Sequence, residues 1–186
     1  MQSQRFHASL VPLVATSTST ETSDQIYLAE EALNLWSAIL EQTATPAPQT
    51  TAQLFQNLIP SLEVASEMLD RALSILDAYI YLIPSEIIRD SQLIFGKFVP
   101  IISGTRREPI GLITNSLDLI LNSAVQIGGV SAVEQVVSSL ISSNFLTTML
   151  ASLRDAYEAH QTTGPNQKYP AIDGVVETGS SAFLSL

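Results

Sequence analysis

The chain has 186 residues, of which 18 are acidic and 8 basic, so its formal net charge is −10 with both histidines neutral. It contains no cysteine, which excludes disulfides, cysteine zinc ligands and a cysteine nucleophile. The acidic balance argues against direct nucleic-acid binding. An apolar fraction of 46% with only 14% charged residues argues against intrinsic disorder.

The N-terminal residues predict part of a packed helix. Residues 6–14 are mostly apolar, but the apolar run at 8–15 is short and holds Pro12, which is atypical of a signal peptide. No window of about 20 residues is uniformly apolar. We therefore expect no membrane insertion.

The central part of the chain predicts a series of amphipathic helices. Apolar residues recur at spacings of three and four, as they do along one face of a helix. Capping-box patterns, in which two side chains satisfy free backbone groups at a helix start, begin at Thr22, Thr50, Thr105 and Ser131. These patterns predict helices over 24–42, 50–63, 65–83, 85–103, 108–127 and 131–160, the last as one long or two short helices.

Prolines and glycines mark the expected joints between these helices. Pro60 should kink or split the helix that contains it, and Pro84 should occupy a first turn. Gly128 and Gly129 should stop the helix over 108–127. No segment alternates apolar and polar residues over the length of a strand, so the predicted fold class is all-α.

An internal repeat connects two of the predicted helices. Residues 31–40 and 71–80 align at an offset of 40, with Ala and Leu identical at 32 and 33 and at 72 and 73. A period near 40 built from helix pairs is the signature of HEAT repeats. We therefore expect a HEAT-repeat α-solenoid of three to four antiparallel helix pairs, in which the 24–42 and 65–83 helices lie parallel in one layer.

The repeat also predicts how the chain is organised. Units are expected near 24–63, 65–104 and 107–160, followed at 161–186 by a loop and the start of a further helix. Because neither end has a polar cap, residues 1–186 are expected to be a segment of a longer solenoid. A partner should contact the inner layer, formed by the 50–63, 85–103 and 131–160 helices.

The same periodicity separates core from surface. Burial is expected for the large side chains of the two repeated helices: Leu33, Trp36, Leu73, Leu76, Tyr79 and Ile80. Trp36 and Tyr79 are interpreted as packing residues. The acidic stripe of Glu67, Asp70 and Asp77 is interpreted as a solvated face rather than a metal site.

No catalytic constellation emerges from the sequence. His7 and His160 are far apart in the chain, and the zinc-protease, phosphate-loop, dinucleotide and serine-elbow motifs are all missing. The adjacent pair Arg106 and Arg107 predicts either a solvated turn or a contact with a phosphate or an acidic partner. We expect no catalytic residue, no cofactor and no metal, and hence no enzyme.

Residues 6–100 resemble a known family in the order of their packing motifs. The stretch from Tyr27 to Trp36 is followed by a proline-containing loop, then by Ser66-Glu67 with Leu69, and finally by Tyr79-Ile80 before Leu82. This order resembles the importin-β (karyopherin-β) superfamily, in particular its importin-eleven branch. Residues 101–186 resemble it mainly in helix rhythm.

The resemblance implies a HEAT-repeat nuclear transport receptor. Such receptors carry protein cargo, commonly basic, through nuclear pores and shuttle between nucleus and cytoplasm. They bind Phe-Gly nucleoporins and release cargo under control of the GTPase Ran, whose principal surface lies in N-terminal repeats that the resemblance does not cover. No site residue matches one to one.

Two other readings remain open at this stage. The first is a HEAT scaffold or adaptor outside nuclear transport, which shares the fold. The second is an α-helical enzyme or small-molecule carrier, for which the chain offers no nucleophile or metal-binding pattern.

Overall fold

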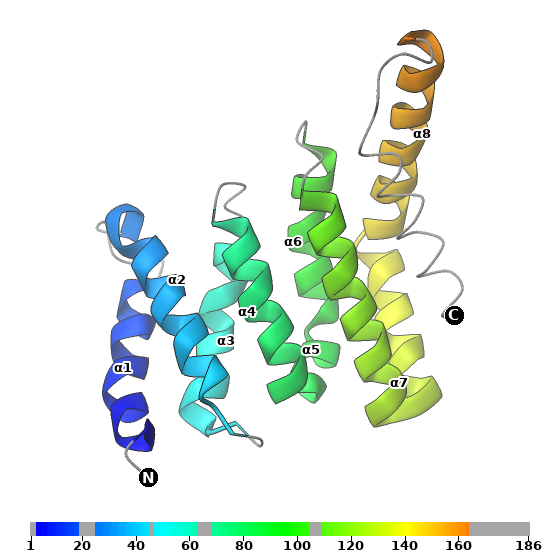
Figure 1. Cartoon of the computed structure of the whole chain (residues 1–186). Helices are drawn as coiled ribbons and strands as arrows, with labels where there is room; N and C mark the ends of the chain where they lie inside the picture. Colours follow the sequence, from blue (N-terminus) through cyan, green and yellow to red (C-terminus); the bar gives the residue numbers. More distant parts are fainter. Residues whose placement is uncertain (1–2, 19–24, 45–46, 63–67, 105–108, 164–186) are drawn as a thin grey trace. The chain divides into compact units, whose positions relative to one another are not determined.

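The computed structural model describes residues 3–18, 25–44, 47–62, 68–104 and 109–163. All regular secondary structure within these ranges is helical, which confirms the predicted all-α class (Figure 1). The chain divides into two compact units, residues 1–87 and 88–186, and each is described by itself.

Two antiparallel helix pairs build the first unit. Helix α1 (Ser3–Ser17) packs on α2 (Gln25–Glu41), and α3 (Gln49–Ser61) packs on α4 (Leu69–Leu82). The pairs stack so that α1 contacts α3 and α2 contacts α4. Figure 1 shows α2 and α4 running in the same direction within one layer. This arrangement confirms the side-by-side packing predicted from the 40-residue offset.

The core of the first unit lies between these two layers. All six side chains expected to be buried are buried, and Trp36 and Tyr79 are completely covered. Of the acidic stripe, Asp70 is exposed, whereas Asp77 is half-buried, against expectation. Because α4 packs against both α2 and α3, its covered arc is wide and reaches Asp77, which follows the buried Leu76. Glu67 lies outside the described residues.

Helix α3 begins differently from the prediction. Its N-cap is Pro48, with no side-chain capping bond, so Thr50 lies inside the first turn and does not form a capping box. Thr51 is buried there. Pro60 does not split the helix, because it sits in the last turn and α3 ends one residue later.

Helices α6, α7 and α8 pack on one another in the second unit. They span Ser91–Ser103, Pro109–Ser142 and Phe145–Thr163, and each contacts the other two. Phe145 starts α8, and its ring lies 5.6 Å from that of Phe95 and 6.4 Å from that of Phe98, measured between centroids. These three buried rings form the aromatic part of the unit's core.

Two predicted helices are each divided by a short break. The 85–103 helix consists of α5 (Pro84–Arg89), with proline in its first turn as predicted, and α6, separated by Asp90. The 131–160 region divides at Asn144, whose φ of 62° is left-handed. Asparagine tolerates this conformation because its short polar side chain bonds locally.

The sequence predicted that a helix ends at Gly128 and Gly129, and the structure has a kink there. Gly129 adopts φ 57° and ψ −141°, and the chain becomes helical again immediately afterwards, so α7 consists of two helical segments. Ser131 therefore lies inside the second segment and does not cap it. The capping boxes expected at Thr22 and Thr105, and the end of the chain from 164 to 186, lie outside the described residues.

By length and composition, α7 is long and apolar enough to cross a membrane, with a mean hydropathy of 1.3 over its most apolar 18-residue window. The non-helical Gly129 interrupts it. Its first segment buries one face, through Ile113, Leu117 and Ile120, and exposes Asn115 and Asn122 on the other. That pattern is typical of a helix packed on other helices.

Candidate functional site: an apolar groove on α7

Acidic and histidine side chains do not form a metal-binding cluster in the part of the chain that the structure describes. His7 and His160 lie on α1 and α8, but their side chains fall outside the described residues. Arg106 and Arg107 also fall outside them. The candidate features are therefore two polar networks and one apolar surface.

The first network is buried between α2, α3 and α4. The indole Nε1 of Trp36 donates to the Tyr79 hydroxyl at 2.9 Å, and that hydroxyl donates to the Thr51 carbonyl at 2.8 Å. Burial raises the pKa of Tyr79 above its usual value, and the bond from Trp36 opposes the rise. Because all three groups are enclosed, this network is part of the core, as the sequence predicted for Trp36 and Tyr79.

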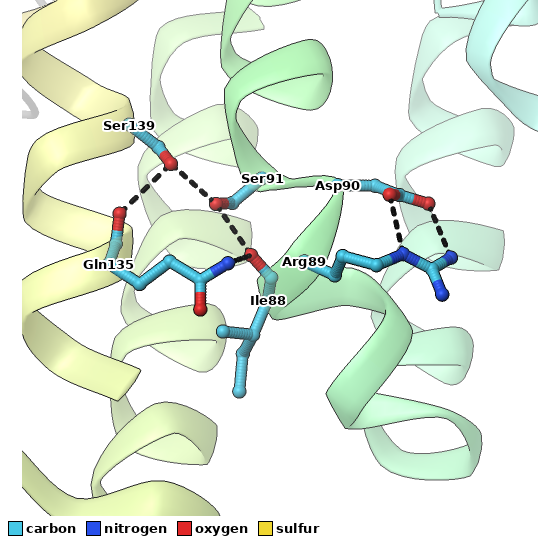
Figure 2. A network of polar contacts seen from close by, with 6 residues as sticks. All are labelled: Ile88, Arg89, Asp90, Ser91, Gln135 and Ser139. Atoms are coloured by element: carbon cyan, nitrogen blue, oxygen red, sulfur yellow. Dashed lines mark hydrogen bonds and ion pairs between the residues drawn. The ribbon is translucent and has the colours of Figure 1, made fainter. Parts of the chain in front are cut away.

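The second network joins the α5–α6 junction to α7 (Figure 2). The hydroxyls of Ser91 and Ser139 lie 2.9 Å apart, with Ser91 Oγ 2.8 Å from the Ile88 carbonyl. Gln135 donates through its side-chain Nε2 to the same carbonyl at 3.4 Å. The backbone carbonyl of Gln135 accepts from the Ser139 hydroxyl at 2.9 Å. The network satisfies a carbonyl at the end of α5, where no helical partner is available.

Beside this junction, Arg89 and Asp90 form a two-point ion pair, with distances of 2.9 and 3.0 Å. The arginine side chain is largely exposed. Surface ion pairs of this kind contribute little to stability. The hydrogen-bonded network, rather than the ion pair, therefore holds the junction against α7.

An apolar groove follows the other side of α7. It has a volume of about 770 Å³, and every lining residue belongs to α7, between Val125 and Ser142. The apolar lining residues are Val125, Val130, Val133, Val137 and Ile141, and the only charged one is Glu134. Val130 is 75% exposed and Ile141 62%.

The kink at Gly129 shapes this groove. A Cβ at Gly128 would lie 2.6 Å from the Cβ of Ala132, so only glycine allows the chain to bend so closely there. Gly129 itself has a positive φ, which favours glycine. Beyond the bend, Val136 and Leu140 are buried, whereas Val130 is exposed and Val133 and Val137 are half-buried.

The sequence predicted no site residue, and it did not predict this groove. The signal was present as a run of aliphatic residues, Val130, Val133, Val136, Val137, Leu140 and Ile141, that is wider than one buried face requires. Periodicity alone does not show which of them a neighbouring helix covers.

Comparison with known proteins identifies a family whose model covers nearly the whole chain and relatives that match about half of it. Residues 1–185 match a family model described as importin-11-like, TPR repeats. Importin-11 of Mus musculus and importin-11 of Homo sapiens are each 32% identical over 87 residues, which is 47% of this chain and 9% of each relative. No solved structure matches the chain.

The family model is described as TPR repeats, whereas the 40-residue offset predicted HEAT repeats, and both names stand for one kind of architecture. TPR units have about 34 residues and HEAT units about 40–47, and both stack helix pairs into a solenoid. The α1–α4 layers have that architecture.

Proposed function

Because the chain belongs to the importin-11-like family, we propose that it is a cargo-contacting segment of a nuclear transport receptor. The observation that carries the proposal is the family match over residues 1–185, on a chain whose helix pairs stack as repeats do. The matched region spans about a tenth of the length of the curated relatives. The receptor's partners and its shuttling between nucleus and cytoplasm are therefore part of the proposal.

The charge of the chain supports a basic protein cargo. Its net charge is −10, and exposed acidic side chains occur in both units, among them Glu30, Glu41, Asp70, Asp155 and Glu158. Complementary charge accelerates the encounter with a basic partner and makes binding weaker as salt rises. We propose that cargo binding by this chain depends on ionic strength in that sense.

Phe-Gly nucleoporins are the second class of partner that we propose. Exposed aliphatic side chains, such as those of α7, provide the kind of surface on which phenylalanine rings are buried. We assign no Ran contact to this chain, because the family's principal Ran surface lies in repeats that the resemblance does not cover. We also propose that the chain binds and does not catalyse.

A pull-down tests the proposal. The purified chain is applied to immobilised Phe-Gly repeats and to matched Ser-Gly repeats, with and without GTP-loaded Ran. Retention on Phe-Gly alone, unchanged by Ran, is the expected result. Equal retention on both matrices would contradict the transport proposal.

A further inference from the structure

The break between α5 and α6 has none of the local causes that usually interrupt a helix. Neither glycine nor proline occurs between Ser85 and Phe95, and the Asp90 side chain makes no capping bond to α6. The Asp90 carboxylate is paired with Arg89 instead. The local sequence is therefore compatible with one continuous helix, as the apolar spacing predicted for 85–103.

The backbone at the break is close to helical geometry. Asp90 has φ −95° and ψ 10°, in the sparsely populated bridge region, whereas a regular helix has φ of about −63° and ψ of about −42°. Rotations of about 30° and 50° at this one residue would restore the helix. The Asp90 carbonyl already accepts from the N–H groups of Leu93 and Ile94, at 3.0 and 3.1 Å. The broken helix and a continuous one are therefore neighbouring conformations of the same segment.

Side chains occupy the acceptor that a continuous helix would use. In a helix, the N–H of Gln92 donates to the Ile88 carbonyl four residues earlier. Among the described residues, that carbonyl instead accepts from Ser91 Oγ at 2.8 Å and from Gln135 Nε2 at 3.4 Å. A serine hydroxyl that bonds to nearby backbone competes with the helix. Insertion of a side chain into the series of backbone bonds is a known cause of a helix break.

Helix α7 holds the serine in that position. Ser91 is fully buried, and its hydroxyl lies 2.9 Å from that of Ser139, on the second segment of α7 (Figure 2). Ser139 is also buried and is bonded to the Gln135 backbone carbonyl. Buried hydroxyls keep their partners, because loss of a partner leaves a polar group unsatisfied. The contact with α7 therefore fixes the Ser91 side chain on the Ile88 carbonyl.

We propose that the α5–α6 junction is a conformational switch. Its broken state is held by Ser91 together with Ser139 and Gln135 of α7, and its released state is a continuous helix. The boundary between the two compact units follows Ile87, directly before this junction. The switch therefore couples the second segment of α7 to the direction in which the chain enters the second unit. A ligand that binds one state more tightly would shift the junction to that state. The proposal does not depend on the transport function.

NMR spectroscopy of the full chain tests the proposal. In the broken state the Gln92 amide does not donate to Ile88, so it should exchange with solvent much faster than the Ile94 amide. Ser91→Ala removes the competing hydroxyl and supplies a stronger helix former. We expect exchange at Gln92 to slow by about tenfold or more in this variant, because the amide gains a helical acceptor. The Asp90 Cα chemical shift should move toward its helical value.

Three further variants separate the switch from a loss of packing. Ser91→Ala/Gln135→Ala frees the Ile88 carbonyl completely and should give the largest change in both signals. Ser139→Ala removes only the partner of Ser91 on α7, so it should move both signals in the same direction by less. Ser103→Ala is the matched control, because the Ser103 hydroxyl donates within α6, to the Val99 carbonyl at 2.9 Å. It should leave the junction unchanged.

Two results would overturn the proposal. The first is an unchanged Gln92 amide and Asp90 shift in Ser91→Ala, which would mean that the break does not depend on the hydroxyl. The second is faster exchange at Gln92 and Ile94 alike, which would mean that the serine only stabilises packing and that no continuous helix forms. Ser139→Ala decides between the same outcomes if Ser91→Ala does not fold.

Discussion

The Trp36 indole and the Tyr79 ring meet edge to face, with centroids 6.1 Å apart and planes at 81°, and a hydrogen bond of 2.9 Å joins their polar atoms. Trp36 comes from α2 and Tyr79 from α4, the two helices that occupy equivalent places in consecutive pairs. Tyr79 passes the bond on to the Thr51 carbonyl of α3. A chain of two hydrogen bonds thus joins three helices across an apolar core.

Truncation of the indole tests this contact. Trp36→Ala should lower the free energy of unfolding by about 3–5 kcal/mol, because it leaves a cavity and removes the donor to Tyr79. Trp36→Phe should have a clearly smaller effect, since most of the ring packing remains. Urea unfolding followed by circular dichroism measures both changes. A loss under about 1 kcal/mol for Trp36→Ala would show that the indole is not part of the core.

Because of the Tyr79 hydroxyl, the free energy of unfolding should vary with pH in the alkaline range. The folded chain keeps its proton because burial raises its pKa, whereas the unfolded chain releases the proton above the usual tyrosine value of about 10. Stability should therefore be constant below about pH 10 and fall above it by up to about 1.4 kcal/mol per pH unit.

Tyr79→Phe is the control for that slope. It should cost about 1–3 kcal/mol at neutral pH, because the Trp36 donor is left buried without its acceptor. It should also remove the fall in stability above about pH 10. Urea titrations from pH 8 to 11 compare the two proteins, and parallel curves would refute the assignment.

A substitution at Thr51 should leave the free energy of unfolding nearly unchanged. Its side chain is 1% exposed, and its Oγ1 has no hydrogen-bond partner. Valine has nearly the same shape, so Thr51→Val should change the unfolding free energy by less than about 1 kcal/mol or raise it. Thermal and urea unfolding measure the change. A larger loss would mean that the hydroxyl is bonded in solution.

Two exposed glycines should respond in opposite directions to alanine. Gly129 has φ 57° and Gly96 lies within α6, and a Cβ at either position would meet nothing within 4 Å. Gly129→Ala should therefore destabilise by about 1–3 kcal/mol through backbone strain, and Gly96→Ala should stabilise by about 0.5–1 kcal/mol. Changes of the same sign in calorimetry would contradict the assigned backbone at Gly129.

The layers of the first unit could be predicted because two independent signals agree. Apolar spacing defines the inward faces of α2 and α4, and the repeat places the two helices side by side. The break at Asp90 could not be predicted, because neither glycine nor proline is present there, and over 131–160 the sequence left one long or two short helices open. The break at Asn144 depends on how α6 and α8 pack, with Phe145 inserted beside Phe95.

The groove escaped prediction for a related reason. Val130 and Val136 are the same residue type on the same helix, and only the presence of a neighbouring helix makes one exposed and the other buried. Pro60 was expected to kink or split its helix, yet it lies in the last turn of α3 without dividing it.

Nuclear entry of a large passenger tests the transport function most directly. The full chain is fused to an inert fluorescent protein assembly too large to diffuse through nuclear pores and is added to permeabilised cells, beside the unfused assembly. The account predicts that the fusion enters nuclei and that excess Phe-Gly peptide, but not Ser-Gly peptide, prevents entry. Exclusion of the fusion and the unfused assembly to the same degree would contradict it.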